Sequence, residues 1–343
     1  MKSRVLSFGS LASPLARSQT QTVIDRIQEK LPRLTCQLNV LASPVAEGHR
    51  ESEPFSAVSR QEWEFLAAQL RDEQSRLIVV EAPDLPYPLP EDLAVVCVPD
   101  RSNPFDAFLN RQGLIMDEMT DGSSVGVLSL RSKAQMSALW PDISFQVLRG
   151  GIDRAMETHL RKSEIDGLVL PAAVTEHLGI QGIVAEIFSP EFILPGAGQG
   201  ILVVVGLAGD LEVGELLSDL HSKPSSVELQ AELAFRSRIV SDQDLPVGAL
   251  ARVRDGELVI LGATGSGVNR ISVNGPVTEA EAIGAGLAQQ ILSSGKSFID
   301  LLEADFPEGI PDDEEDDELL DSGDDLDDLD DPDDLDDLED LRR

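Results

Sequence analysis

Over the first 210 residues, short apolar runs alternate with segments in which apolar residues recur at helical spacing. The runs predict strands at Val5–Phe8, Thr35–Leu41, Leu77–Val80, Ser124–Leu128, Phe145–Leu148, Gly167–Leu170 and Ile201–Val205. The helical patterns cover Leu15–Lys30, Gln61–Leu70, Lys133–Leu139 and Ile152–Arg161. Short buried strands separated by helices are typical of parallel sheets covered on both faces. The sequence therefore predicts an α/β fold.

The pattern changes near Asp210. A helix is predicted after that residue, then a hairpin of Val247–Arg254 and Glu257–Gly262 around the turn Asp255-Gly256, and then a helix over Glu279–Ser293. A chain of 343 residues has room for two or three domains. We therefore expect a separate, small α+β domain after the α/β part.

The C-terminal segment is strongly acidic. Between Asp312 and Arg343 it holds 20 acidic residues and two arginines, mostly as Asp-Asp-Leu repeats. Like charge at this density prevents the burial of enough apolar area to offset the entropy of ordering, which predicts a disordered acidic tail over 311–343. Two roles remain open for it: a solubilising tail, or a segment that docks a basic protein through its spaced leucines.

The rest of the chain is acidic as well, because it carries −17 of the total net charge of −35. Such a surface repels phosphate backbones and anionic lipids, so we expect no nucleic acid and no membrane as partners. The two cysteines, Cys36 and Cys97, fall in predicted strands and the four histidines are scattered, so we expect neither disulfides nor a metal site. The chain shows no secretion signal and no run of eighteen apolar residues, which predicts a cytoplasmic protein; we expect a monomer.

Seven short stretches occur in the order and spacing of one enzyme family. They are Ser13–Ala16, Pro104–Phe108, Ser129–Arg131, Leu148–Gly150, Leu194–Gly200, Ala231–Arg238 and Pro246–Gly248. Each is weak alone, but together they resemble the porphobilinogen deaminase (hydroxymethylbilane synthase) family. Those enzymes join four porphobilinogen molecules head to tail in haem and chlorophyll synthesis.

The resemblance implies a particular fold: two periplasmic-binding-protein-like α/β domains joined by crossing strands and a small third α+β domain. We expect boundaries of 1–98 with 195–212 for the first domain, 99–194 for the second and 213–310 for the third, followed by the acidic tail over 311–343 that the charge pattern predicts.

The family's catalytic aspartate lies in the pattern H-S-x-K-D-x-P. Here the stretch reads from Val80 to Pro86, and Asp84 falls on the aspartate. The resemblance implies that this carboxylate assists the loss of ammonia and stabilises the cationic intermediates. The residues alone leave another interpretation open, in which Asp84 is a turn residue between two prolines.

Each added pyrrole carries an acetate and a propionate, so the family lines its site with basic and hydroxyl groups. The resemblance assigns substrate binding to Ser13, Ser129, Arg131, Arg149 and Arg154, the last lying one residue from the expected arginine. The alternatives are a helix cap before Pro14 for Ser13 and surface ion pairs for the arginines. Other residues stand where basic ones are usual: Leu11, Pro83, Ser132 and the pair Glu176-His177.

The family attaches a dipyrromethane cofactor by a thioether to a cysteine in the pattern G-G-C-x-x-P-[IV]-G. Gln243 occupies that place here, and an amide lacks the soft sulfur nucleophile that the bond requires. Cys36 and Cys97 are expected to pack as small apolar residues in strands of the first domain. We therefore predict no bound cofactor and no cofactor-binding residue.

Two functions follow from these features. The favoured one is a deaminase-like protein with impaired or lost catalysis that binds a small molecule, such as a pyrrole, or a partner protein. The alternative is an active hydroxymethylbilane synthase in which Asp84 is the catalytic carboxylate and the primer is held without a cysteine. A plain scaffold recruited through the acidic tail is a third interpretation without positive support.

Overall fold

The computed structural model describes residues 5–45, 58–152, 155–156, 162, 164–239, 246–267 and 269–293. All of them lie in the first of two units into which the chain divides, Met1–Pro307. Arg154, Gln243 and the acidic tail lie outside the described residues, as does most of the helix predicted over Ile152–Arg161.

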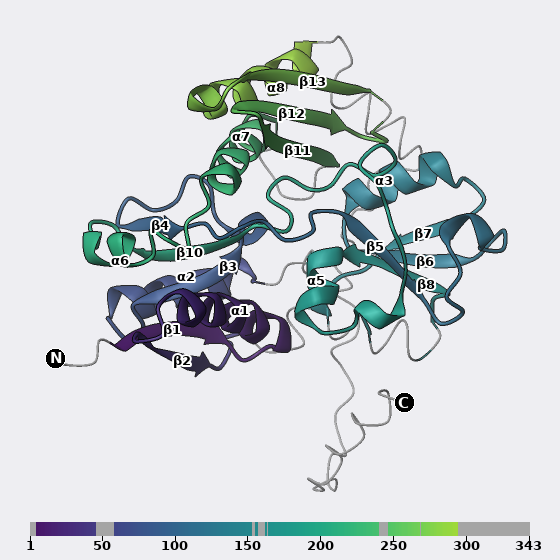
Figure 1. The fold of residues 1–343 in the computed structure, drawn as a ribbon. Coiled ribbons are helices and arrows are strands. Elements are labelled where there is room, and N and C mark those ends of the chain that lie inside the picture. The colour runs from purple at the N-terminus through teal and green to yellow at the C-terminus, as the bar shows by residue number, and fades with distance from the viewer. Residues whose placement is uncertain are drawn as a thin grey trace, which may run out of the picture. The chain divides into compact units, whose positions relative to one another are not determined.

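The first sheet has five strands in the order β2-β1-β3-β10-β4 (Figure 1). They are β1 (Val5–Leu11), β2 (Thr35–Leu41), β3 (Leu77–Glu81), β4 (Leu93–Cys97) and β10 (Leu202–Leu207). Three helices pack on this sheet: α1 (Pro14–Lys30), α2 (Arg60–Arg71) and α6 (Leu211–Leu216). The hydroxyl of Ser13 accepts a hydrogen bond from Ala16 N and caps α1, as the Ser-Pro pair predicts.

The second sheet has the order β7-β6-β8-β5-β9. Its strands are β5 (Asp106–Asn110), β6 (Ser124–Val127), β7 (Ser144–Val147), β8 (Gly167–Pro171) and β9 (Val184–Ile187), with helices α3 (Leu130–Leu139) and α5 (Ala172–His177). Short 3-10 helices interrupt the loops at η2 (Ala82–Asp84), η3 (Met116–Glu118), η5 (Gln181–Ile183) and η6 (Val277–Glu279).

Both five-stranded sheets are mixed, so the prediction of parallel sheets was wrong in this respect. β10 runs antiparallel to β3 and β4 in the first sheet, and β5 runs antiparallel to β8 and β9 in the second. The reason is the path of the chain, which crosses from the first sheet to the second after β4 and returns before β10. β5 and β10, the strands that follow the two crossings, therefore run against the direction of the parallel strands in their sheets.

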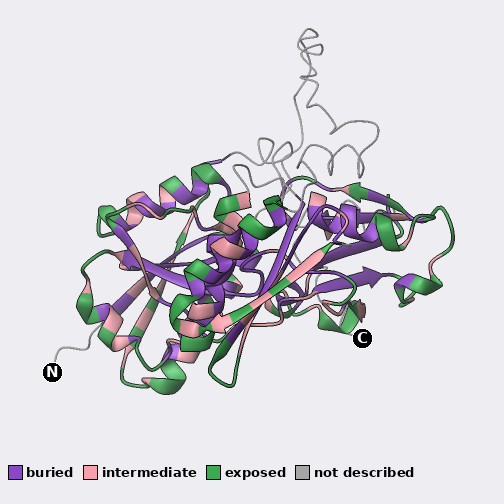
Figure 2. Cartoon of the chain, turned by 90° about the horizontal axis from the view of Figure 1, so that it is seen from above, coloured by how far each residue is buried: buried purple, intermediate pink, exposed green. Residues whose placement is uncertain are grey.

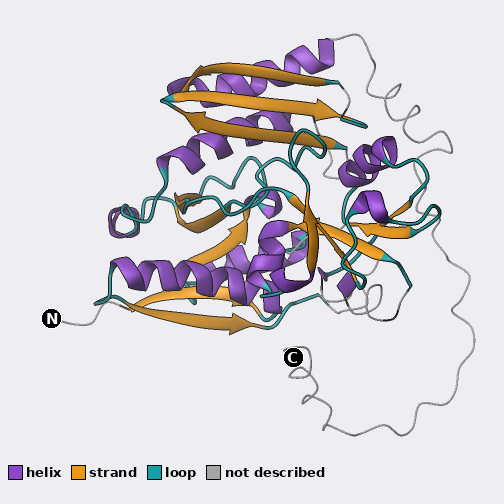
Figure 3. Cartoon of the chain, turned by 45° about the vertical axis from the view of Figure 1, so that its right-hand side comes forward, coloured by secondary structure: helices purple, strands orange, loops and turns teal. Residues whose placement is uncertain are grey.

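The small α+β part consists of β11 (Val247–Arg254), β12 (Glu257–Thr264), β13 (Arg270–Pro276), α7 (Lys223–Ile239) and α8 (Ala280–Ser293). Its antiparallel strands follow one another in chain order, and the two helices cover one face (Figure 3). The predicted turn at Asp255-Gly256 joins β11 to β12, and both residues have positive φ, 51° and 83°, as a tight hairpin turn needs.

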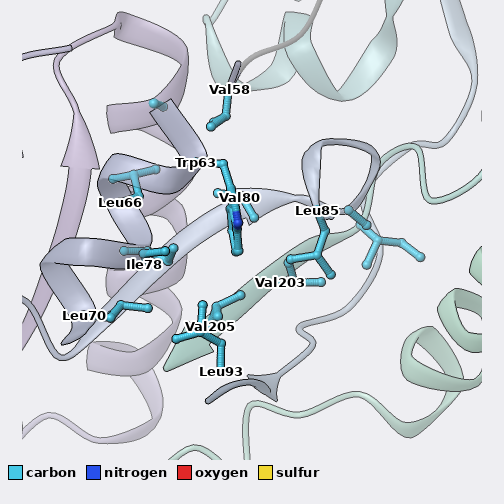
Figure 4. Packing of buried hydrophobic residues seen from close by; sticks show 14 of the residues in the cluster. Val58, Trp63, Leu66, Leu70, Ile78, Val80, Leu85, Leu93, Val203 and Val205 are labelled. Carbon is cyan, nitrogen blue, oxygen red and sulfur yellow. The ribbon is translucent and has the colours of Figure 1, made fainter. Parts of the chain in front are cut away.

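The two faces of the first sheet are covered by different helices, as the alternation along β3 requires. Ile78 and Val80 pack with Trp63 of α2 (Figure 4). Leu77 lies in the other core, with Ile24 of α1. The strands inside the sheets are largely buried (Figure 2). The predicted α/β layering with helices on both faces is therefore confirmed for this sheet.

The domain boundaries expected from the resemblance place 213–310 in the third domain. Val213, Leu217 and Leu220 nevertheless pack in the core of the first sheet, beside Phe8 and Cys97. Residues 213–220 therefore belong with the first sheet, and the small α+β part begins with α7, whose Leu229 and Leu233 also pack in a core of that sheet. No helix within the described part of the chain is long and apolar enough to cross a membrane.

The helices α7 and α8 approach each other most closely at Gly284. A Cβ atom there would lie 2.0 Å from the carbonyl oxygen of Ala231, whereas one at Gly286 would meet nothing within 4 Å. We expect Gly284→Ala to lower the free energy of unfolding by about 1–3 kcal/mol through overpacking. Gly286→Ala is the matched control and should be stabilising by up to about 1 kcal/mol. Urea unfolding of both variants checks this, and equal stability of the two would contradict the packing described.

Candidate functional site

The three sheets are connected at one loop, Leu194–Gly200, which we call the junction loop. Gln199 is its buried centre. The side-chain amide nitrogen of Gln199 donates to Pro104 O at 2.7 Å and to the carboxylate of Asp106 at 2.9 Å. Its side-chain oxygen accepts from Gly196 N at 3.2 Å. The loop is thus tied to the start of β5 in the second sheet.

The side chain of Arg131 bonds to residues at this junction. Its guanidinium forms an ion pair with Asp106 at 2.8 Å and donates to Leu194 O at 2.8 Å, and both side chains are buried. A buried arginine with this set of partners fixes the position of α3 against the junction loop. The substrate-binding role of Arg131 remains a prediction, and these contacts give it a structural role.

Glu232 joins the small α+β part to the same loop. Its side chain is 0% exposed, and its carboxylate accepts from Gly198 N at 2.5 Å, from Ala251 N at 2.7 Å and from the guanidinium of Arg101 at 2.6 Å. One turn earlier on α7, Glu228 accepts from Val253 N at 3.1 Å. The helix α7 therefore holds both the junction loop and strand β11 through charge-assisted hydrogen bonds.

Asp84 ends the short helix η2, directly after β3, and is half-buried. We call residues 82–85 the Asp84 turn. Glu81 lies just before it, at the position where the family pattern has a serine, and is buried. The carboxylate of Glu81 accepts from Gly200 N at 3.0 Å and from the amide of Gln19 at 3.4 Å, and burial raises its pKa. A second carboxyl group, that of Glu81, therefore lies directly before the Asp84 turn, and the sequence analysis did not identify it.

The remaining predicted residues lie at the carboxyl ends of parallel strands. Ser13 follows β1 and Asp84 follows β3, and these two strands are neighbours in the first sheet. Ser129 follows β6 and Arg149 follows β7, which are neighbours in the second sheet. Carboxyl ends of neighbouring parallel strands meet at one sheet edge, which is where open α/β sheets bind ligands. Arg154 is outside the described residues.

Both serines also cap helices, and Arg149 is exposed. Ser13 Oγ accepts from Ala16 N at 3.3 Å, and Ser129 Oγ accepts from Ser132 N at 3.1 Å. A hydroxyl that accepts a backbone hydrogen bond can still donate its proton, so capping and binding are compatible, although Ser129 Oγ also lies 3.0 Å from Ser132 Oγ. Of the two predicted arginines that the structure describes, Arg131 is buried and Arg149, at the end of β7, is exposed to solvent.

The two thiols lie at the outer strands of the first sheet, Cys36 in β2 and Cys97 in β4. Burial raises the pKa of the Cys36 thiol, and it raises the pKa of the Cys97 thiol to about 12. The thiolate, which is the nucleophilic form, is therefore disfavoured at both positions. Among the described residues, no cluster of histidine, cysteine, aspartate or glutamate could hold a metal ion.

His177, at one of the two positions where a basic pair is usual, contacts α1 instead. The backbone oxygen of His177 accepts from Ser18 Oγ at 2.5 Å, and its ring nitrogen Nδ1 lies 3.4 Å from Thr22 Oγ1. Burial and the charge of Arg26 lower the pKa of His177 to about 4. The imidazole is therefore neutral at pH 7 and supplies no positive charge to a ligand.

Several residues that shape this site were missed from the sequence: Gln19, Glu81, Arg101, Gln199, Glu228, Glu232 and Arg236. Gln199, Glu232 and Arg236 fall inside stretches that carry the family resemblance, which could have pointed to the first two, whereas the family's helix pattern leaves position 236 open. The others bond mainly to partners far along the chain or to the backbone, and no local pattern marks such contacts.

Two mixed α/β sheets that the chain crosses between twice, with polar side chains at the ends of parallel strands, define a two-lobed α/β protein of the binding-protein type. The family model "Porphobilinogen deaminase, dipyromethane cofactor binding domain" matches residues 6–215. The chain therefore belongs to the porphobilinogen deaminase family.

Two curated relatives agree with this assignment, and one solved structure is given after them for comparison alone. A porphobilinogen deaminase of Roseiflexus sp. (strain RS-1) is 32% identical over 85% of this chain and 97% of its own length. One of Thermus thermophilus is 33% identical, with the same coverage of both chains. Among solved structures, the chain matches the Methionine Binding Protein, MetQ, at 12% identity and a TM-score of 0.37, over 63% of this chain and 89% of that one.

The residues present do not fit the covalent cofactor that the family model names. The thioether needs a thiol, and position 243 is glutamine while both thiols of the chain lie in strands of the first sheet. Glu81 adds a buried carboxylate beside the Asp84 turn, and the guanidinium of Arg131 is engaged by Asp106. The polar groups at this site thus do not match a fixed polycarboxylate pyrrole.

Glu232→Gln tests the contacts between α7 and the junction loop. The amide keeps the shape but removes the charge that faces Arg101, so we expect a loss of about 3–5 kcal/mol in the free energy of unfolding. Glu281→Gln, at an exposed position on α8, should change it by less than about 0.5 kcal/mol. Urea unfolding measures both, and equal effects would show that the buried carboxylate does not hold the junction.

His177 makes stability depend on pH. Its folded-state pKa of about 4 lies below its usual 6.5, so between these pH values the unfolded chain binds a proton that the folded chain does not. The free energy of unfolding should therefore fall as pH is lowered from 6.5 toward 4, by at most about 1.4 kcal/mol per pH unit from this group. His177→Gln should show a shallower fall in urea unfolding at pH 7, 6 and 5. Parallel curves for the two proteins would contradict it.

Proposed function

We propose that this chain binds a small molecule of the pyrrole class at the Asp84 site and does not extend a covalently anchored pyrrole chain, so that deaminase turnover is impaired or lost. The proposal rests on the glutamine at the anchor position and on the burial of the two thiols of the chain. Gln243 stands at the anchor position, and the thiols of Cys36 and Cys97 sit in strands with their pKa raised by burial. A thioether primer has no thiolate from which to form.

The charges of the site support the same proposal. Leu11, Pro83 and Ser132 stand at positions where the family has basic residues. The guanidinium of Arg131 is held by Asp106. A growing tetrapyrrole gains two carboxylates with every unit, so a site with this balance of charge holds a long chain poorly and a single unit better.

The retained groups suit one pyrrole unit. Asp84 is a half-buried carboxylate at the end of a parallel strand, a suitable partner for a pyrrole N–H or a protonated aminomethyl group. Arg149 is exposed at the corresponding edge of the second sheet and suits an acetate or a propionate. We place Ser13 and Ser129, whose hydroxyls lie at the same two edges, as further contacts.

The test is made on the full chain, purified from a host that synthesises porphobilinogen. We expect an intact mass without dipyrromethane, no consumption of porphobilinogen, and reversible calorimetric binding of one porphobilinogen per chain. Asp84→Asn should weaken that binding about tenfold or more, because it removes the charge that pairs with the ligand. Asp72→Asn, at an exposed position of the same α/β part, is the control and should bind as the parent does.

Two results would overturn the proposal. A mass excess for dipyrromethane, or turnover that Asp84→Asn abolishes, would establish the alternative of an active hydroxymethylbilane synthase with a primer held without cysteine. Absence of porphobilinogen binding together with absence of turnover would remove the pyrrole from the proposal and favour a partner protein.

A further inference from the structure

One arginine of the small α+β part reaches the Asp84 turn. Arg236, on α7, donates from Nη1 to Pro83 O at 3.1 Å and from Nη2 to Leu85 O at 3.3 Å. The two carbonyl groups belong to the residues immediately before and after Asp84. A planar guanidinium that bonds both of them fixes the backbone on each side of the carboxylate.

The turn is held on its other side by the junction loop and by Ile201, the residue that follows it. Ala82 N donates to Ile201 O at 2.8 Å, and Leu85 N closes the turn on Ala82 O at 3.2 Å. Gly198, with a φ of +82°, approaches so closely that a Cβ atom there would lie 3.0 Å from the Cβ of Ala82. The Asp84 turn is therefore clamped between Arg236 and the junction loop.

The charge of Arg236 acts on the same carboxylate. Burial lowers the pKa of its guanidinium, and the negative charge of Asp84 opposes this shift. The two charges are thus close enough to interact. Position 83, where the family pattern has a lysine, is a proline here, so a positive charge beside Asp84 comes from a different element of the chain. Position 236 is one of those that the family's helix pattern leaves open.

We infer that Arg236 is the positioning residue of Asp84: its two hydrogen bonds fix the Asp84 turn, and its charge lies beside the carboxylate in place of a basic neighbour in the sequence. The inference rests on the proposed function, since it concerns the carboxylate that binds the ligand. Both hydrogen bonds go to the backbone carbonyls that flank Asp84, so Arg236 acts through Asp84 and orients it toward an N–H or ammonium group. The small α+β part thereby contributes to the binding site of the two α/β sheets.

The experiment compares Arg236→Leu, Arg236→Lys and, as the control, Arg254→Leu at an exposed position of β11. The first measurement is the hydrogen exchange of the Leu85 amide, which needs no ligand. Arg236→Leu should speed that exchange about tenfold or more, because the turn loses both hydrogen bonds from the guanidinium. Arg236→Lys keeps the positive charge but lacks the planar guanidinium that bonds both carbonyl groups, so the Leu85 amide should exchange at an intermediate rate. Arg254→Leu should leave the rate unchanged.

The second measurement separates positioning from general stability. Arg236→Leu should weaken porphobilinogen binding about tenfold in the parent chain. In the Asp84→Asn background, the same substitution should change the affinity less than about twofold, because the group through which it acts is already gone. Equal losses in both backgrounds would overturn the inference.

The two proposals fail in different ways. If the parent chain does not bind porphobilinogen, the proposed ligand is wrong, while the exchange of Leu85 still reports whether Arg236 holds the turn. If the parent binds and Arg236→Leu leaves both the exchange rate and the affinity unchanged, Arg236 does not position Asp84.

Discussion

The buried carboxylate of Glu232 is the contact on which the arrangement of this chain depends. A charge that is 0% exposed is tolerated only where hydrogen bonds replace its lost water. Here they come from three separate parts of the chain: Gly198 of the junction loop, Ala251 of β11 and Arg101 of the segment that crosses to the second sheet. The small α+β part is thus fastened to the crossing segments by charge as well as by apolar packing.

The same loop carries the other internal contacts of the site. Gln199 and Arg131 meet at Asp106, and Gly200 N binds the carboxylate of Glu81. Polar networks of this kind are stable only when every member has its partner. Arg131, which the family resemblance assigns to substrate binding, here bonds to the junction loop. Glu81, which lies close to Asp84 in the sequence, bonds to the same loop. This explains how the architecture of the family persists although the balance of charge at the site has changed.

The periodicity of the chain predicted most of its elements, because buried strands and amphipathic helices leave their spacing in the sequence. All of the predicted strands were found, and Ser13 caps α1 as the Ser-Pro pair indicates. The strands β5, β9 and β13 were missed, and the direction of β10 was wrong, since a strand's direction depends on the path between sheets. Asp84 was found through the family pattern. Arg236 could not be found, because its acceptors are backbone carbonyls about 150 residues away.

The clamp on the Asp84 turn also bears on what kind of protein this is. A scaffold needs the turn only as a connection, for which an ordinary exposed loop is sufficient. Here a guanidinium is desolvated enough to lower its pKa, and a glycine with positive φ is packed against Ala82, in order to hold one carboxylate in place. Removing a charged group from water is unfavourable unless its partners compensate, so such a contact is characteristic of a site that needs defined geometry. The loss of the thiol anchor and the retention of a clamped Asp84 are therefore compatible, and together they favour a ligand-binding protein over a scaffold.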